Sequence, residues 1–207
     1  MTNRISGSSC ASGKNSVMKS ERNAAPLGRN VSEAAGERLR CLMIVEGIVE
    51  YLREHALILA TAESCTAGRI VALLAEIPGS GSLVECGYVV YSPEAKRRLL
   101  GVSAKTIADF NLTSVEVARE MAIGALRDSP ATVAIATTGL CGNESVDGIP
   151  GGTVCFAWGF VNADRYCVFT RKHRFFGERE TMQHDAALHA LKHLPQFHQR
   201  MLAGETA

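Results

Sequence analysis

The sequence predicts an α/β fold, a three-layer α/β/α sandwich around a mixed, partly parallel sheet. In the first two thirds of the chain, short apolar segments with the length of buried strands alternate with segments of helical periodicity. Later, a tight connection at residues 162–164 separates two strand-like segments, which indicates an antiparallel hairpin. Parallel strands joined by helices present their loops at the carboxyl ends of the strands, so functional residues are expected there.

One domain is expected, because 207 residues with 46% hydrophobic content can bury one substantial core. We predict that it spans residues 34–197. Residues 1–33 are rich in Ser, Gly, Asn, Ala and basic residues and hold few large apolar side chains. Such a segment cannot offset the entropy lost on folding, so it is predicted to be a disordered N-terminal tail. Residues 198–207 are assigned to a C-terminal tail.

The first half of the chain is predicted to form helix, strand, helix, strand and helix. The opening helix follows from apolar residues at helical spacing, and each strand is a short run of apolar or small residues. The third helix has the clearest ends, with Ser92 as N-cap, Pro93 at the first helical position and Gly101 after the last. These elements cover residues 32–53, 57–62, 68–74, 86–90 and 93–100.

The second half is predicted to form two helices, three strands and a final helix. Thr113 and Glu116 have the spacing of a capping box at the start of the second and longer of these two helices. Pro195 is expected to end the last helix, because proline cannot donate the backbone hydrogen bond that a helix interior needs. These elements cover residues 103–110, 113–127, 131–136, 153–160, 165–175 and 178–195.

The composition favours a small-molecule partner. Lys and Arg total 22 against 21 acidic residues, so no global field attracts nucleic acid or an anionic membrane. Seven cysteines without a C-x-x-C pair argue against a disulfide framework or a cysteine zinc site, and they favour a reducing cytosol. No apolar run approaches the roughly 18 residues of a membrane helix, so a cytoplasmic protein is expected.

Two strand-to-helix junctions carry the candidate chemistry. Ser64 follows the first strand, where free backbone N–H groups suit an anion or a developing oxyanion. The alternative is that Ser64 or Thr66 only caps the next helix. At the second junction, Lys96 lies in the first helical turn and Tyr91 at the strand end, where its hydroxyl could relay a proton or orient the lysine.

Lysine can activate a serine only when it is neutral. At its ordinary pKa of about 10.4, roughly one lysine in 2,500 is neutral at pH 7. Burial and a positive helix end can together supply the roughly 4 to 5 kcal/mol that brings this pKa near 7. Ser–His catalysis and Cys65 as nucleophile are weaker alternatives, because neither has a local partner in the sequence.

Two further patterns have ordinary structural explanations. The glycine-rich segment after Thr138 lacks the spacing of ATP or dinucleotide loops, so a flexible connection is an equal alternative to a phosphate site. Asp185, His189 and His193 share a helical face and could ligate a metal, but a solvated polar face explains them better.

Several motifs occur together in a known order. They are Thr61-Ala62-Glu63-Ser64-Cys65-Thr66, Pro78-Gly79-Ser80, Tyr91-Ser92 with Lys96, Leu100-Gly101-Val102, Thr138-Gly139 and Phe176-Gly177-Glu178-Arg179. Over about residues 40–195 the chain resembles the CinA C-terminal domain family, whose enzymatic members are nicotinamide-nucleotide amidohydrolases. The resemblance implies hydrolysis of nicotinamide mononucleotide to nicotinate mononucleotide and ammonia by a serine–lysine mechanism, with no metal and no cofactor.

The resemblance also implies roles for individual residues. Ser64 would be the nucleophile, Lys96 the base and Tyr91 a helper. The candidate substrate-binding residues are Glu63, Thr66, Thr138, Gly139 and Arg179. A homo-oligomer, such as a dimer, is expected from the type of sheet.

Departures from the family pattern leave the substrate open. Ala67 stands where the family usually has Gly, Pro93 where it has Asn, and Phe176 where it has Pro. The family's Ile-Ala-Gly-Pro is Leu-Cys-Gly-Asn at residues 140–143, and a second arginine after Arg179 is missing. The alternatives are a non-catalytic nucleotide-binding or regulatory protein, and a serine–lysine amidase for a different small amide.

Overall fold

The computed structural model describes residues 31–163 and 165–205. The predicted tail over residues 1–33 therefore lies almost wholly outside the described residues. The helices are α1 (Val31–Glu54), α2 (Arg69–Ala75), α3 (Pro93–Leu100), α4 (Ala104–Phe110), α5 (Val115–Asp128) and α6 (Arg179–Leu202), with a short 3₁₀ helix η1 (Ser80–Ser82). The strands are β1 (Leu59–Glu63), β2 (Val84–Val89), β3 (Val133–Gly139), β4 (Thr153–Asn162) and β5 (Arg165–Arg174).

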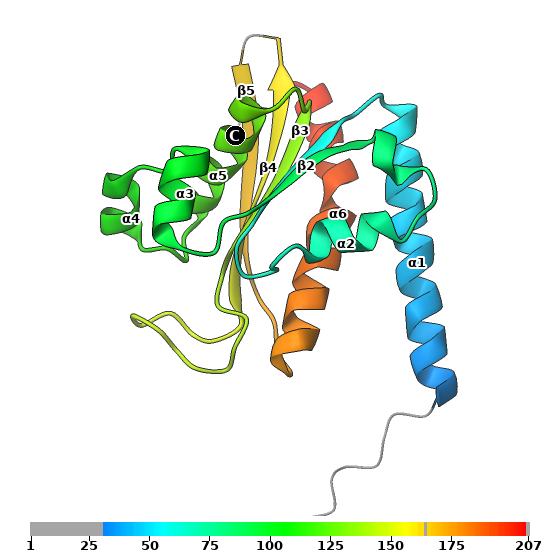
Figure 1. Ribbon diagram of the computed structural model, residues 1–207, viewed down its shortest axis with the longest axis horizontal. Helices are drawn as coiled ribbons and strands as arrows, with labels where there is room; N and C mark the ends of the chain where they lie inside the picture. The colour runs from blue at the N-terminus through cyan, green and yellow to red at the C-terminus, as the bar shows by residue number, and fades with distance from the viewer. Residues whose placement is uncertain (1–30, 164, 206–207) are drawn as a thin grey trace, which may run out of the picture.

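The strands form one mixed sheet in the order β2-β1-β3-β4-β5 (Figure 1). β1 pairs in parallel with both β2 and β3, whereas β3 with β4 and β4 with β5 are antiparallel. The prediction of an α/β fold with a partly parallel sheet and a late hairpin is therefore confirmed. Because the chain leaves β1 toward β2 and later returns to β1's other side as β3, the carboxyl ends of β1 and β3 mark a topological switch point.

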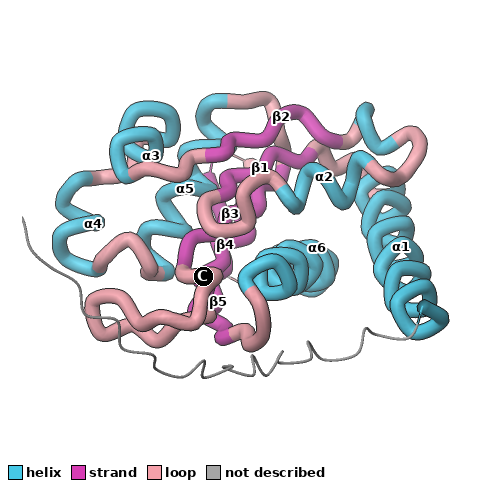
Figure 2. Tube along the Cα trace, turned by 60° about the horizontal axis from the view of Figure 1, so that its bottom comes forward, coloured by secondary structure: helices cyan, strands magenta, loops and turns pink. Residues whose placement is uncertain are grey.

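Helices cover both faces of the sheet (Figure 2). Along β3, Val133 and Ile135 point toward the layer of α1, α2 and α6, whereas Ala134 and Ala136 point toward α3 and α5. Successive strand residues face opposite sides of a sheet, so this alternation of large and small side chains builds one thick and one thin apolar layer.

A close contact with α5 positions α3. At Gly124 of α5 an added Cβ would lie 2.1 Å from the carbonyl oxygen of Leu100, so only glycine lets α3 pack this closely. The predicted ends of α3 are confirmed: Ser92 Oγ accepts from Ala95 N–H at 3.0 Å, and Gly101 has a left-handed φ of 66°. α3 is therefore packed closely against α5.

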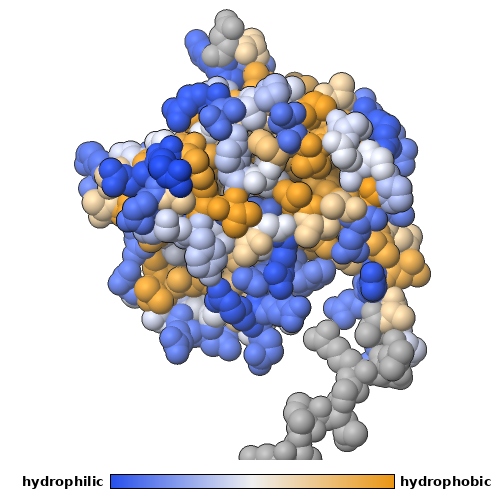
Figure 3. Space-filling view, viewed as in Figure 1, coloured by the Kyte–Doolittle hydropathy of each residue, from blue (hydrophilic) through white to orange (hydrophobic). Residues whose placement is uncertain are grey.

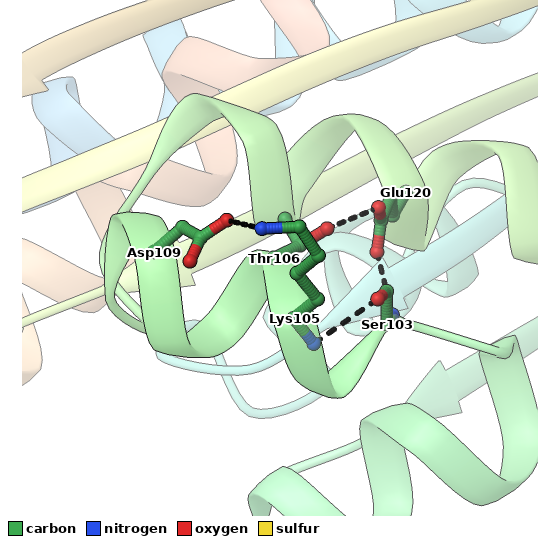
Figure 4. A network of polar contacts seen from close by, with 5 residues as sticks. All are labelled: Ser103, Lys105, Thr106, Asp109 and Glu120. Atoms are coloured by element: carbon green, nitrogen blue, oxygen red, sulfur yellow. Dashed lines mark hydrogen bonds and ion pairs between the residues drawn. The ribbon is translucent and has the colours of Figure 1, made fainter.

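Further polar contacts tie α4 to α5. Figure 4 shows the Glu120 carboxylate accepting from Ser103 N–H and from the Thr106 hydroxyl, while Lys105 pairs with Asp109 on the surface. The N-cap of α5 is Ser114, whose Oγ accepts from Val117 N–H at 3.3 Å. The predicted capping role of Thr113 is therefore wrong by one residue.

The prediction that the last helix ends at Pro195 is also wrong. α6 continues through Pro195 to Leu202, so residues 198–202 are helical. Proline removes one helical hydrogen bond, but Phe197 and His198 are buried beyond it. His198 Nδ1 lies 2.9 Å from the Tyr51 hydroxyl of α1. Tertiary packing thus outweighs the local cost of the proline.

The surface facing the viewer in Figure 1 has apolar side chains grouped around β2 and α2, bordered by polar ones (Figure 3). β2 is an edge strand, and Val89 at its end is 52% exposed. A homo-oligomer stays a prediction. No helix within residues 31–163 and 165–205 combines the length and apolar character needed to cross a bilayer.

Candidate active site

A cavity of about 580 Å³ opens at the carboxyl ends of β1 and β3. Six of the eight predicted site residues line it, namely Ser64, Tyr91, Lys96, Thr138, Gly139 and Arg179. They come from four separate segments of the chain, which the parallel strands bring to one edge of the sheet. A larger groove of about 730 Å³ lies between α1, α2 and α6 and contains none of these residues.

Ser64 and Lys96 meet in this cavity. Lys96 Nζ lies 2.8 Å from Ser64 Oγ, 2.8 Å from the carbonyl oxygen of Val90 and 3.3 Å from that of Tyr91. A neutral amine has two hydrogens and one lone pair. When the two carbonyls accept those hydrogens, the lone pair remains for the Ser64 proton. The geometry is therefore that of a base hydrogen-bonded to a nucleophile.

Burial favours the neutral form of this lysine. The Lys96 side chain is 1% exposed, and desolvation lowers its pKa from the ordinary value. An electrostatic interaction with the nearby Cys65 acts in the opposite direction and is the smaller effect. The result moves Lys96 in the direction that general base catalysis requires.

Glu63 organises the turn that carries Ser64. Its side chain is fully buried, and its carboxylate accepts hydrogen bonds from five groups. These donors are the hydroxyls of Thr61 and Thr66 and the backbone N–H groups of Gly68, Ile70 and Val71. Three of the donors are N–H groups at the start of α2, which have no acceptor within the helix. A carboxylate suits this place because the start of a helix is the positive end of its dipole.

The structure does not bring two of the predicted substrate-binding residues into the cavity. Glu63 and Thr66 are both 0% exposed, and the Thr66 hydroxyl is engaged with Glu63 at 2.7 Å and with Thr137 at 2.7 Å. They position the turn and do not border the cavity. Because Glu63 satisfies the helix start, neither Ser64 nor Thr66 is its side-chain cap. The Ser64 hydroxyl is therefore not used in capping and is free to contact Lys96 and a ligand.

We expect Glu63→Gln to lower the free energy of unfolding by about 3 kcal/mol, because an amide nitrogen would face buried N–H donors. Urea unfolding followed by circular dichroism measures this change. Glu76→Gln removes an exposed carboxylate near the other end of α2 and should alter the unfolding free energy by less than about 0.5 kcal/mol. Equal effects of the two substitutions would contradict the assigned role of Glu63.

Tyr91 contributes differently from the prediction. Its main-chain carbonyl, not its hydroxyl, contacts Lys96 Nζ. The hydroxyl accepts from Arg179 Nη2 at 2.8 Å, and Arg179 Nη1 donates to the Cys141 carbonyl at 2.8 Å. The Tyr91 hydroxyl therefore orients Arg179 at the rim, and the predicted hydroxyl–lysine contact is not present.

The end of β3 forms one wall. The Thr138 hydroxyl donates to the Leu112 carbonyl at 2.8 Å, so toward a ligand its oxygen can only accept. At Gly139 an added Cβ would lie 2.4 Å from the Thr153 carbonyl oxygen. Glycine is thus required here by the close approach of β4.

Some residues in or next to the cavity were not predicted as site residues. Asn143 and Glu144 line the cavity from the loop after β3. Gln183 of α6 does not line it but donates to the Cys65 carbonyl at 2.9 Å. No local sequence signal marks them, because their places depend on how a loop and a distant helix fold back. In the part of the chain that the structure describes, no three His, Cys, Asp or Glu side chains converge to hold a metal. The alternative that Asp185, His189 and His193 ligate a metal therefore has no support from the structure.

Known proteins are similar to this chain in sequence and in fold. The sequence model of the CinA C-terminal domain matches residues 43–198. The nicotinamide-nucleotide amidohydrolase PncC of Escherichia coli K12 is 34% identical over 154 residues, which cover 74% of this chain and 92% of that protein. A CinA-like protein of Geobacter sulfurreducens is 36% identical over 181 residues, covering 84% of this chain but only 43% of that protein. The crystal structure of competence damage-inducible protein A (ComA) from Klebsiella pneumoniae has a TM-score of 0.71 at 34% identity, covering 75% of this chain and 95% of that one.

Proposed function

Because this chain belongs to the CinA C-terminal domain family, we propose that it is an amidohydrolase that converts nicotinamide mononucleotide to nicotinate mononucleotide and ammonia. The observation that carries the proposal is the 2.8 Å separation of Ser64 Oγ and Lys96 Nζ in the wall of a cavity. The named activity of the PncC relative supplies the substrate class.

In the proposed first step, Ser64 Oγ attacks the carboxamide carbon while Lys96 Nζ accepts its proton. The carbonyl oxygen becomes an oxyanion, which needs preorganised donors. Ala67 N–H donates to the Ser64 carbonyl at 3.2 Å, which leaves the N–H groups of Cys65 and Thr66 as the candidate donors. One such donor lowers the barrier by about 3 kcal/mol.

In the second step, the Lys96 ammonium returns its proton to the amide nitrogen, and ammonia leaves an ester at Ser64. Water then attacks this ester, with Lys96 again accepting a proton and passing it to Ser64 Oγ. The products are the carboxylic acid and free enzyme. Lys96 acts in both halves because it regains its neutral form after each proton transfer.

Arg179 is proposed to bind the phosphate of the nucleotide. It lines the cavity, and its contacts with Tyr91 and Cys141 fix the guanidinium plane at the rim. A guanidinium held in this way presents its remaining N–H groups in a fork that suits phosphate oxygens.

The purified chain incubated with nicotinamide mononucleotide should release ammonia and nicotinate mononucleotide in equal amounts. Binding of the nucleotide without turnover would instead favour the regulatory protein. Labelling of Ser64 by a fluorophosphonate without action on this nucleotide would favour an amidase for another small amide.

A further inference from the structure

A buried glutamine of α6 reaches the turn that carries Ser64. Gln183 is 8% exposed, and its Nε2 donates to the main-chain carbonyl of Cys65 at 2.9 Å, across 118 residues of sequence. A buried amide is costly unless it is hydrogen-bonded, so this contact also holds the Gln183 side chain in place. Because Gln183 does not line the cavity, it acts on the backbone of the turn and not on a ligand.

The carbonyl that Gln183 holds shares a peptide unit with the Thr66 N–H. In a planar trans peptide the C=O and N–H bonds point in opposite directions. The Cys65 carbonyl points toward Gln183 on α6, so the Thr66 N–H points away from that helix. Within residues 31–163 and 165–205, this N–H has no protein acceptor. It is therefore available as a donor beside the nucleophile.

The other candidate oxyanion donor is oriented within the turn itself. The Cys65 N–H shares its peptide unit with the Ser64 carbonyl, which accepts from Ala67 N–H at 3.2 Å. That hydrogen bond joins residues three positions apart. The direction of the first donor thus depends on local structure, whereas the direction of the Thr66 N–H depends on a helix that is distant in the sequence.

The backbone of this turn needs such an outside contact. Ala67 and Gly68 have left-handed φ values of 53° and 89°, a region that alanine rarely adopts. If the peptide unit between Cys65 and Thr66 turned over, its carbonyl oxygen would take the place of the N–H and would repel a developing oxyanion. The hydrogen bond from Gln183 stabilises the orientation in which the N–H is presented.

We propose that Gln183 is a positioning residue, which keeps the Thr66 N–H directed at the substrate carbonyl oxygen as that oxygen becomes negative. The inference rests on the proposed function for its substrate, but it applies to any acyl transfer to Ser64. Backbone donors stabilise an oxyanion best when they are already oriented before the reaction. Such a donor favours the transition state over the bound amide, so kcat depends on Gln183 and KM does not.

Gln183→Met removes the donor and keeps the length of the side chain. With nicotinamide mononucleotide as substrate, kcat should fall about 10- to 100-fold and KM should stay within about twofold. This is less than the roughly 10²- to 10³-fold lost with a whole oxyanion donor, because a peptide that is no longer held keeps the catalytic orientation part of the time. Gln183→Glu keeps the shape but repels the Cys65 carbonyl, so its kcat should fall at least as far.

Gln199→Met is the matched control. Gln199 is also a glutamine of α6 whose Nε2 donates a hydrogen bond, but its acceptor is the Tyr51 hydroxyl of α1 at 3.0 Å. The substitution removes the same chemical group from the same helix without touching the Ser64 turn. Its kcat should stay within about twofold of the unaltered chain.

A second measurement does not depend on the nucleotide. The rate at which a fluorophosphonate labels Ser64 should fall about 10- to 100-fold in Gln183→Met, because the phosphonyl oxygen occupies the oxyanion position. If the unaltered chain is labelled but does not hydrolyse the nucleotide, the proposed substrate is wrong, and the labelling rates decide the role of Gln183. If Gln183→Met does not fold, Gln183→Glu decides it.

Unchanged kcat and labelling rates in the folded Gln183 variants would overturn the inference. A rise in KM alone would also overturn it, since this result would place Gln183 in substrate binding. An unaltered chain that shows neither turnover nor labelling would overturn both the inference and the proposed function.

Discussion

Ser64→Ala is expected to lower ammonia release from nicotinamide mononucleotide by at least about a thousandfold, because removing the nucleophile of a serine hydrolase leaves only binding and oxyanion stabilisation. The fold should survive. Glu63 satisfies the start of α2, and Lys96 keeps two carbonyl acceptors when the hydroxyl is lost. The unfolding free energy should therefore change by less than about 1 kcal/mol. Steady-state ammonia assays and urea unfolding measure the two quantities.

Ser80→Ala is the matched control for this variant. Ser80 is also buried, at 5% exposure, but it lies in η1 just before β2, at the opposite end of the parallel strands. Its loss should leave turnover within about twofold, because Ser80 does not line the cavity. The loss of one buried hydroxyl should lower the free energy of unfolding by only about 1 kcal/mol. Undiminished turnover in Ser64→Ala would remove Ser64 from the mechanism.

Much of the fold could be predicted from local signals. Ser92, Pro93 and Gly101 mark both ends of α3 because capping depends on the few residues at a helix terminus. The meeting of Ser64 with Lys96 also follows from the sequence pattern. Both residues come just after parallel strands, and the carboxyl ends of such strands lie at one edge of the sheet.

Other features depend on contacts that the local sequence does not specify. Pro195 looks like a helix end until the apolar residues beyond it find the sheet and α1. Glu63 looks like a ligand-binding acid next to a nucleophile, yet the chain turns back so that its carboxylate faces the N–H groups of α2.

The role of Lys96 leads to a prediction with two readouts. Lys96→Met should lower turnover by about 10²- to 10⁴-fold, the usual contribution of a general base. Lys96→Arg should lose as much, because a guanidinium stays charged and cannot accept the Ser64 proton. In the unaltered chain, kcat/KM should rise with pH through an inflection below 10.5, since burial lowers the pKa of Lys96 from that ordinary value. Both variants should lack this inflection.

The free energy of unfolding should also depend on pH through the protonation of Lys96. Between the lowered folded pKa of Lys96 and its ordinary value of 10.5, the unfolded chain binds more protons than the folded chain. The free energy of unfolding therefore rises with pH across this window, and this contribution is lost as the pH falls toward the folded pKa.

Lys96→Met has no such group. The difference in unfolding free energy between the unaltered chain and Lys96→Met should therefore shift in favour of the unaltered chain as the pH rises toward 10.5. Lys105→Met, which removes an exposed lysine of α4, should keep both the inflection and the pH-dependent gain. A constant stability difference between the unaltered chain and Lys96→Met would mean that Lys96 is as easily protonated inside the fold as in water, and it could not then serve as the base.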